Sequence, residues 1–478
     1  MVYQFVNASG DNSNSGLTKE APVATPLQAM VNIIGAGENG SHMIFTDSST
    51  YSISGGALGH ALGSYTGDRL NIMAETGSNG LPIVSPILDG GNSNGTGGSV
   101  STGAIRLSAG WVVRGITFQN FIPIDGPSGY GVIYARSLGA STNPEFVLTI
   151  EDCVFRHITG SCINIGQGSN DNGLHKINRN KFYDICLGGS GSYVVTIGAA
   201  SNKKMKVTNN LFYDLQFLDS DDGIILGGGT RGPETIISHN VFGTSSIEAL
   251  NESSIQYPNL PVKCIGGKLE YNIAYKQTVA GGAASFFTMN GGEARYNITF
   301  GLAGANSGNA PFAGTTDVTA SVGNLTSDPL FKGTPDSALV GTDASTNGYK
   351  LRGPTSPAFD AAIGSSDVTT DITGEGRVAL DAAALDTGVF DIGAFELTGL
   401  YSTAVPDSLP QEGGDFVINR IPNADNQFKR GLRDSNEDVL GRDVDQLPLT
   451  TAINGAVPTF IRKRPTANTQ STSKKSKG

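Results

Sequence analysis

Short runs of alternating apolar and polar residues recur along the chain, with glycine, asparagine and serine between them. LTIEDCVFRHI at residues 148–158 is one such run, and GIILGGG at residues 223–229 shows the glycine-rich corners. Apolar runs of four to six residues divided by glycine are typical of strands that bury one face. Helical repeats would need ten or more residues at 3.6-residue spacing, and we find no such repeat. The pattern predicts an all-β protein.

Two of these runs are nearly the same sequence: INRNKFYDI at residues 177–185 and VTNNLFYDL at residues 207–215. Related segments, including a weaker early one, occupy residues 112–121, 148–158, 236–244, 269–275 and 294–300. Their aligned asparagines are separated by 30, 30, 32 and 25 positions. Self-similarity at this period indicates a solenoid or a propeller, and the signatures of WD and kelch blades are missing. We therefore predict a parallel β-helix in which each period forms one coil.

Stacked coils explain why the repeat keeps the same side chains. Equivalent residues of successive coils lie about 4.8 Å apart, so identical side chains contact one another. We expect a stack of phenylalanines inside the coils and a ladder of asparagine amides at a corner, where the amides pair with each other and with turn backbone. The predicted ladder residues are Phe155, Phe182, Phe212, Phe242, Asn180, Asn210 and Asn240.

One helix is expected, at the N-terminal end of the solenoid. TPLQAMVNIIG at residues 25–35 has Thr25 as an N-cap, Pro26 at the first helical position and Gly35 as a stop signal. An open β-helix exposes a sheet edge and its apolar core at each end. We expect this helix to lie across the first coil as a cap.

Several motifs resemble the right-handed parallel β-helix proteins of the pectin-lyase-like superfamily. Residues 3–34 resemble their first strand, Gly-Asp loop and cap helix, and a series of later segments resembles a C-terminal signature of the group. These segments are SDPLF (327–331), NGYKL (347–351), SPAFDAA (356–362), TDITGEGR (370–377) and DIGAFE (391–396). The resemblance spans residues 1–397 and implies a right-handed, single-stranded parallel β-helix. It says little about activity, because the superfamily includes lyases, hydrolases, adhesins and virion spikes.

The organisation expected along the chain has four parts. Residues 1–36 form the first strand and the capping helix, residues 37–320 the β-helix, and residues 321–397 further coils and a closing segment. Residues 398–478 form an extension that ends in a flexible basic tail. Relatives with this C-terminal signature are commonly exported with a signal peptide, whereas MVYQFVNASGDNSNSG has no signal-peptide pattern. This departure resembles a viral structural protein, such as a phage tailspike or a capsid-decoration subunit.

Charge is distributed unevenly between the body and the tail. The net charge is −11, but residues 462–478 hold six basic side chains and no acid, which leaves a body with 26 basic and 43 acidic ones. An acidic body argues against nucleic acid as its partner. No apolar run is long enough to cross a membrane. The tail is either a solvated end or an arm that binds other virion proteins.

The strongest candidate chemistry lies in the segment LDSDDG, which holds Asp219, Asp221 and Asp222. Arg231 and His239 follow one period later and could supply a base or a substrate clamp. Carboxylate pairs at suitable separation cleave glycosides. The alternative is ordinary turn chemistry, in which the aspartates face solvent.

Asp184 and Asp214 are expected to be partners in neighbouring coils. Two stacked carboxylates repel each other, which raises the pKa of one or recruits a cation such as Ca²⁺. They could equally be residues that end strands. We predict no other cofactor.

Two functions follow as hypotheses. The first is a virion structural protein, a homotrimeric spike or decoration subunit that is assembled in the host cytoplasm and stabilises the particle or contacts the host surface. The second is a polysaccharide lyase or glycosidase that acts on acidic glycans, free or as part of a tailspike. A third and weaker reading is a cell-surface adhesin that leaves the cell by a non-standard route.

Overall fold

The computed structural model describes the chain over part of its 478 residues. The described residues are 1–36, 40–53, 69–91, 105–107, 110–122, 131–135, 147–165, 174–187, 193–197, 204–217, 223–227, 235–243, 262–275, 286–301, 312–332, 348–353, 355–362, 368–377, 390–397, 415–418 and 430–433.

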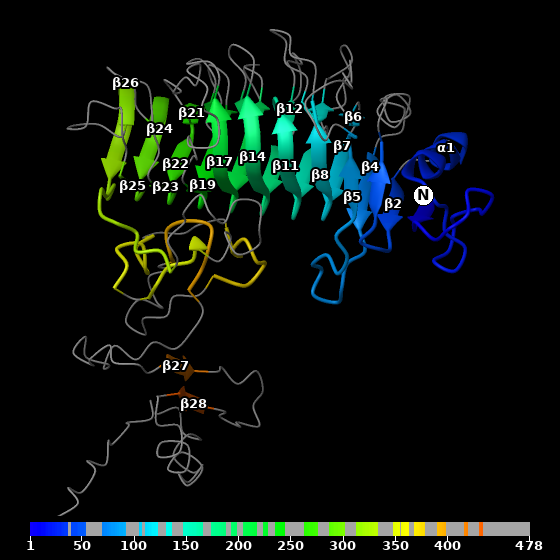
Figure 1. The fold of residues 1–478 in the computed structure, drawn as a ribbon. Coiled ribbons are helices and arrows are strands. Elements are labelled where there is room, and N and C mark those ends of the chain that lie inside the picture. Colours follow the sequence, from blue (N-terminus) through cyan, green and yellow to red (C-terminus); the bar gives the residue numbers. More distant parts are fainter. Residues whose placement is uncertain are drawn as a thin grey trace, which may run out of the picture. The chain divides into compact units, whose positions relative to one another are not determined.

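The body is a parallel β-helix in which successive turns of the chain, the coils, contribute short strands to three stacks (Figure 1). The first stack contains β1 (Tyr3–Val6), β2 (Ser41–Phe45), β4 (Arg69–Ala74), β7 (Gly110–Arg114), β10 (Leu148–Glu151), β13 (Leu174–Asn178), β16 (Lys204–Thr208), β19 (Thr235–Ser238) and β22 (Lys268–Glu270). The second stack contains β3 (Thr50–Ser52), β5 (Ile87–Asp89), β8 (Thr117–Phe121), β11 (Val154–Thr159), β14 (Lys181–Leu187), β17 (Leu211–Phe217), β20 (Val241–Phe242), β23 (Ile273–Tyr275) and β25 (Ile298–Phe300).

The third stack contains β6 (Ile105–Leu107), β9 (Ile133–Ala135), β12 (Ile163–Ile165), β15 (Tyr193–Ile197), β18 (Gly223–Gly227) and β21 (Val262–Ile265). Two longer strands, β24 (Phe287–Arg295) and β26 (Phe312–Val322), span the first and third stacks at the last described coils. The strands pair parallel within each of the three stacks, and Phe182 lies opposite Phe212 in the register of β14 and β17. The predicted parallel β-helix is therefore confirmed.

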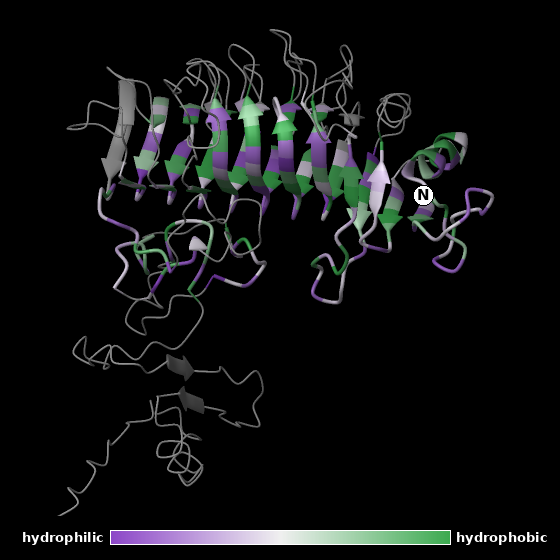
Figure 2. Cartoon of the chain, viewed as in Figure 1, coloured by the Kyte–Doolittle hydropathy of each residue, from purple (hydrophilic) through white to green (hydrophobic). Residues whose placement is uncertain are grey.

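Alternation of side chains builds the core inside the coils. Along β13, for example, His175 and Ile177 are buried while Lys176 is exposed. Figure 2 shows the same mixture of hydrophobic and hydrophilic residues along the strands. Buried aliphatic and aromatic side chains from all three stacks form one continuous hydrophobic cluster that runs through the coils. Burial of this continuous surface is the main force that holds one coil on the next.

The N-terminal end of the β-helix is covered by helix α1 (Pro26–Ala36), which contacts β1 and β2. Its N-cap has the expected form, because the Gln28 backbone N–H donates to Thr25 Oγ1 at 3.3 Å. Met30 and Ile33 are fully buried in the core cluster, so the helix closes the end of the apolar interior. It continues one residue past Gly35. Within the described part of the chain, no helix has the length and apolar character that crossing a bilayer requires.

The described residues between 327 and 397 form a segment that we call the strap. They contain turns and isolated bridges, such as Phe331 with Leu351, where the sequence predicted further coils before a closing segment. The strap is coloured yellow to orange in Figure 1 and lies against the outer side of the second stack. Its apolar side chains and the outward-facing side chains of β14, β17, β20, β23 and β25 form a second hydrophobic cluster.

The contacts divide the chain into two compact units, Met1–Thr398 and Gly399–Gly478. The second unit contains β27 (Asp415–Ile418) and β28 (Arg430–Arg433), which pair antiparallel with Asp415 opposite Arg433. The basic tail that the sequence predicts at residues 462–478 lies outside the described residues.

Candidate functional site

The residues predicted to carry catalysis are mostly outside the described part of the chain. Asp219, Asp221, Asp222 and Arg231 all lie in undescribed segments on either side of β18. Their catalytic role stays a prediction.

Asp184 and Asp214 occupy equivalent positions in neighbouring coils, because Tyr183 pairs with Tyr213 and Ile185 with Leu215 on either side of them. Both adopt the left-handed conformation, with φ of 52° and 53°, which aspartate tolerates better than most residues. Asp214 is buried, with 4% of its surface exposed, whereas 35% of the Asp184 side chain is exposed.

His157 continues this row into the preceding coil. Its Nδ1 contacts Asp184 Oδ2, and it too is left-handed, with φ of 52°. The imidazole is about half exposed, so a molecule in solution can reach it. A histidine held by a carboxylate is a competent general base when a substrate lies within hydrogen-bond reach. His157 and Asp184 therefore form a solvent-accessible pair of titratable groups, and Asp214 lies in the next coil.

Among the described residues, no third metal ligand lies with Asp184 and Asp214. The described residues that do bring three ligand atoms together are Asp360, Asp391 and Glu396, in the strap. Calcium takes six to eight oxygen ligands, so two carboxylates alone would not hold it. Metal binding at Asp184 and Asp214 stays a prediction.

His239 lies in the corner between β19 and β20, where none of its surface is exposed. Its Nδ1 is 2.6 Å from Ser238 Oγ, and its ring contacts the Tyr271 ring with centroids 4.9 Å apart. Burial, and then the charge of Arg377, hold the pKa of His239 well below its ordinary value, so the imidazole is neutral. No substrate can touch this side chain while the corner is closed, so its placement supports a structural role.

The corners between the first and second stacks carry a ladder of buried amides. In the corner before β14, the Nδ2 group of Asn180 donates to Asn210 Oδ1 at 3.0 Å and to the Ile150 carbonyl at 2.9 Å. The Asn180 backbone N–H also donates to Asn210 Oδ1, at 2.9 Å. Asn210 and Asn240 repeat the pattern. Each amide thus donates to a carbonyl of the preceding coil and to the amide of the next coil.

This ladder is longer than the three asparagines predicted for it. It continues through Asn272 and Asn297 to Asn324, and at its other end Cys153 takes the asparagine position and donates its backbone N–H to Asn180 Oδ1 at 3.0 Å. Burial raises the pKa of the Cys153 thiol to about 12, so it remains a neutral, structural group.

The phenylalanines stack in the same direction as the amides. The ring centroids of Phe155 and Phe182 are 4.9 Å apart, those of Phe182 and Phe212 are 4.6 Å apart, and those of Phe212 and Phe242 are 5.2 Å apart. Phe118 extends this stack by one coil, at 5.0 Å from Phe155. All of these rings are fully buried. Aromatic and amide ladders therefore run side by side along the axis of the solenoid.

Arg377 of the strap is the centre of a buried polar network. Its Nη2 donates to Asn209 Oδ1 at 2.7 Å, and so ties the strap to the corner between β16 and β17. The same side chain donates to Glu396 Oε2 at 3.0 Å and to three carbonyl oxygens within the strap, those of Thr370, Asp391 and Gly393. A buried guanidinium is tolerated because its donors find acceptors and a countercharge.

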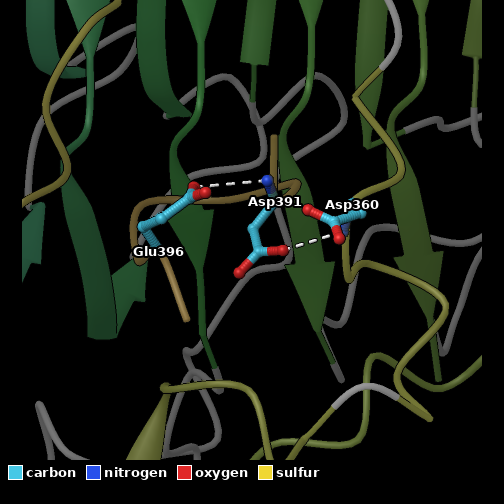
Figure 3. A group of neighbouring side chains, drawn as sticks. All are labelled: Asp360, Asp391 and Glu396. Carbon is cyan, nitrogen blue, oxygen red and sulfur yellow. Dashed lines mark hydrogen bonds between the residues drawn. The ribbon is translucent and has the colours of Figure 1, made fainter. Parts of the chain in front are cut away.

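The carboxyl groups of Asp391 and Glu396 lie close to this guanidinium, and the Asp360 carboxyl lies beside those two acids (Figure 3). The Asp391 N–H donates to Glu396 Oε2 at 3.2 Å, and Asp391 Oδ1 accepts the Asp360 N–H at 2.8 Å. Asp391 Oδ2 accepts the Leu397 N–H at 2.6 Å. Burial and the neighbouring Glu396 carboxylate raise the pKa of Asp391 well above its ordinary value. The carboxyl oxygens of Asp391 and Glu396 crosslink strap backbone, which is a structural use of acids.

The sequence analysis gave Arg377, Asp391 and Glu396 no role. A signal was available, because Asp391 and Glu396 flank the small and apolar residues of DIGAFE, and Arg377 ends the nearby segment TDITGEGR. Charged residues are seldom fully buried unless they are paired, so opposite charges in two such segments indicate a buried pair.

The sequence matches no protein-family model and no curated protein.

Proposed function

We propose that the protein is a structural subunit of a virus particle, a β-helical spike or capsid-decoration protein of the pectin-lyase-like type that functions as a homotrimer. The observation that carries the proposal is the pair of buried ladders, in which Asn180 bonds to Asn210 and Phe182 stacks on Phe212 without a break between coils. Interlocked coils resist bending and unwinding, which is the mechanical property that a spike or a decoration subunit requires.

Two further features support the particle assignment. The body is acidic while residues 462–478 are basic, which fits an arm that binds other virion proteins. The resemblance of residues 3–34 and of segments such as DIGAFE (391–396) to β-helix proteins fits a fold that virion spikes use. Such a subunit would be assembled into the particle in the host cytoplasm.

Purified virus particles test this proposal directly. Mass spectrometry of the particles should find the chain at a stoichiometry that is a multiple of three, and light scattering of the purified protein should give a trimer. Deleting residues 462–478 should leave folding intact and weaken attachment to the particle. A monomeric protein that is missing from washed particles would overturn the proposal.

A depolymerase acting on host-surface acidic glycans is the second candidate, and the exposed His157–Asp184 pair beside Asp214 favours it. Its test is product release from a panel of acidic glycans, with and without Ca²⁺. Asp219→Ala, Asp221→Ala, Asp222→Ala and His157→Gln should each reduce activity at least about tenfold if they carry proton transfer. Failure of the wild type to release product would exclude this candidate and leave the structural proposal standing.

A further inference from the structure

We propose that the strap is a lock: it ties together coils that are far apart along the solenoid, so that the coils cannot separate one by one until the strap has left. In a solenoid each coil contacts only its neighbours, so unfolding can spread from either end. An element that contacts many coils at once removes that route. The strap makes such contacts along much of the described body.

Strap contacts begin near the N-terminal coils. A Cβ atom at Gly374 would lie 2.6 Å from Leu81 Cδ2, so the turn at Gly374 closely contacts the loop that follows β4. That loop in turn contacts the corner at Gly115, where a Cβ would lie 2.7 Å from Pro82 Cγ. The strap residue Asp371 is also close enough to Arg179, in the corner after β13, to attract its charge.

Other parts of the same strap bind the C-terminal coils. The Gly393 N–H donates to the Tyr271 carbonyl at 2.9 Å, in the corner after β22. The ring of Phe331 contacts that of Tyr275 in β23, with centroids 5.0 Å apart. The strap therefore spans the body from the loop after β4 to β23.

Arg377 makes these contacts depend on one another. Its bond to Asn209 joins residues 168 positions apart, while its other four bonds hold the strap segments 370, 391, 393 and 396 together. Removing the guanidinium leaves the buried carboxyl of Glu396 without its countercharge, which is strongly destabilising. We call Arg377 and its five hydrogen-bond partners the hub. The hub thus forms as a unit, and its release frees the strap from early and late coils together.

Asn209 is the residue on the coil side of the hub, and it bonds to the strap in both directions. Its Nδ2 donates to the Thr370 carbonyl at 2.6 Å, and its Oδ1 accepts from Arg377. Asn209 is left-handed, with φ of 56°, a conformation that asparagine tolerates at a corner. A substitution here weakens the lock while leaving the internal bonds of the strap in place.

Hydrogen–deuterium exchange of the full chain, followed through urea unfolding, tests the lock. Wild type should lose protection of the strap and of all coils in one transition. Arg377→Met should make strap peptides exchange about 100-fold faster, and peptides of β20 to β25 should lose protection before those of β1 to β8. Arg352→Met removes an exposed arginine from the same strap and should behave as wild type.

Asn209→Gly keeps the proposal testable if Arg377→Met fails to fold, because glycine adopts the left-handed φ of 56° without strain. It should produce the same separation of early and late coils, with a smaller gain in exchange rate. A single transition in both variants, with every coil weakened equally, would overturn the proposal. Unchanged protection of the strap in either variant would overturn it as well.

Discussion

Asn180 donates its side-chain Nδ2 to Asn210 Oδ1 at 3.0 Å, although 30 residues separate the two along the chain. The same bond recurs at each following step of the ladder, down to Asn324. Because each amide is both donor and acceptor, a change at one step alters the polar groups of its neighbours. The ladder is therefore most sensitive at its middle and least sensitive at its ends.

We predict that Asn240→Ala lowers the free energy of unfolding by about 4 kcal/mol. Asn240 donates to the Val207 and Ser238 carbonyls and to Asn272, and it accepts two bonds from Asn210, all in a corner without exposed surface. Alanine would leave several buried groups unsatisfied. Urea unfolding followed by far-ultraviolet circular dichroism measures the change.

Asn324→Ala is the matched control for the ladder. Asn324 accepts from Asn297 and donates to the Ala294 carbonyl, but it is only partly buried, so water can replace the lost bonds. We expect a loss of about 1 kcal/mol. Equal losses for Asn240→Ala and Asn324→Ala would show that the position in the ladder does not matter.

The phenylalanine stack gives a second prediction. Phe182 lies between Phe155 and Phe212, with ring centroids 4.9 and 4.6 Å away. Phe182→Leu keeps most of the buried volume but loses two stacked contacts, so we expect a cost of about 2 kcal/mol. Phe182→Ala also opens a cavity and should cost about 4 kcal/mol. Equal unfolding midpoints for the two variants in urea would contradict a role for volume in the stack.

The ladders could be predicted because their contacts follow the period of the repeat. One period aligns Asn180 with Asn210 and Phe182 with Phe212, and the register of β14 with β17 keeps that alignment. The capping helix could also be predicted, since its N-cap Thr25 and its first residue Pro26 belong to one short segment of the chain. Local signals and periodic signals are visible in a sequence.

The strap could not be predicted in the same way, because its contacts obey no period. Arg377 bonds to Asn209 across 168 residues, and Gly374 contacts Leu81, with no repeated motif to connect either pair. Where these residues meet depends on the path of the chain after β26 has closed the last described coil. The charges of Arg377 and Glu396 indicate a buried pair, but not which coil they face.

The raised pKa of Asp391 predicts that the strap becomes less stable as the pH rises. Its pKa is raised in the folded protein, so its contribution to stability is complete below the ordinary value of 3.8 and is lost as pH rises through the folded value. Protection of the strap from hydrogen exchange, corrected for the intrinsic rate, should therefore decline as the pH rises above the ordinary value of 3.8. Burial is the larger cause of the raised pKa of Asp391, and repulsion by the Glu396 carboxylate is the second.

Asp391→Asn should flatten that decline. It should also cost about 1 kcal/mol at acidic pH, because the amide NH₂ would face one of the two N–H donors, of Asp360 and Leu397, that the carboxyl oxygens accept. Glu375→Gln neutralises an exposed acid of the same strap and should keep the wild-type slope. A pH dependence that survives Asp391→Asn would assign the decline to another group.

The buried His239 should make the folded protein less stable at acidic pH. Its folded pKa lies well below 6.5, so its contribution to stability is present above 6.5 and is lost as pH falls toward the folded value. The free energy of unfolding should fall by up to about 1.4 kcal/mol for each pH unit below the unfolded value.

His239→Asn should abolish this slope without straining the backbone, because φ is 56° there and asparagine tolerates that conformation. His157→Asn makes the same exchange at another left-handed corner whose side chain is half exposed, and it should leave the acid slope in place. Urea midpoints measured from about pH 7.5 to about pH 5 decide the matter, since an unchanged slope in His239→Asn would mean that acid loosens the fold through some other buried group.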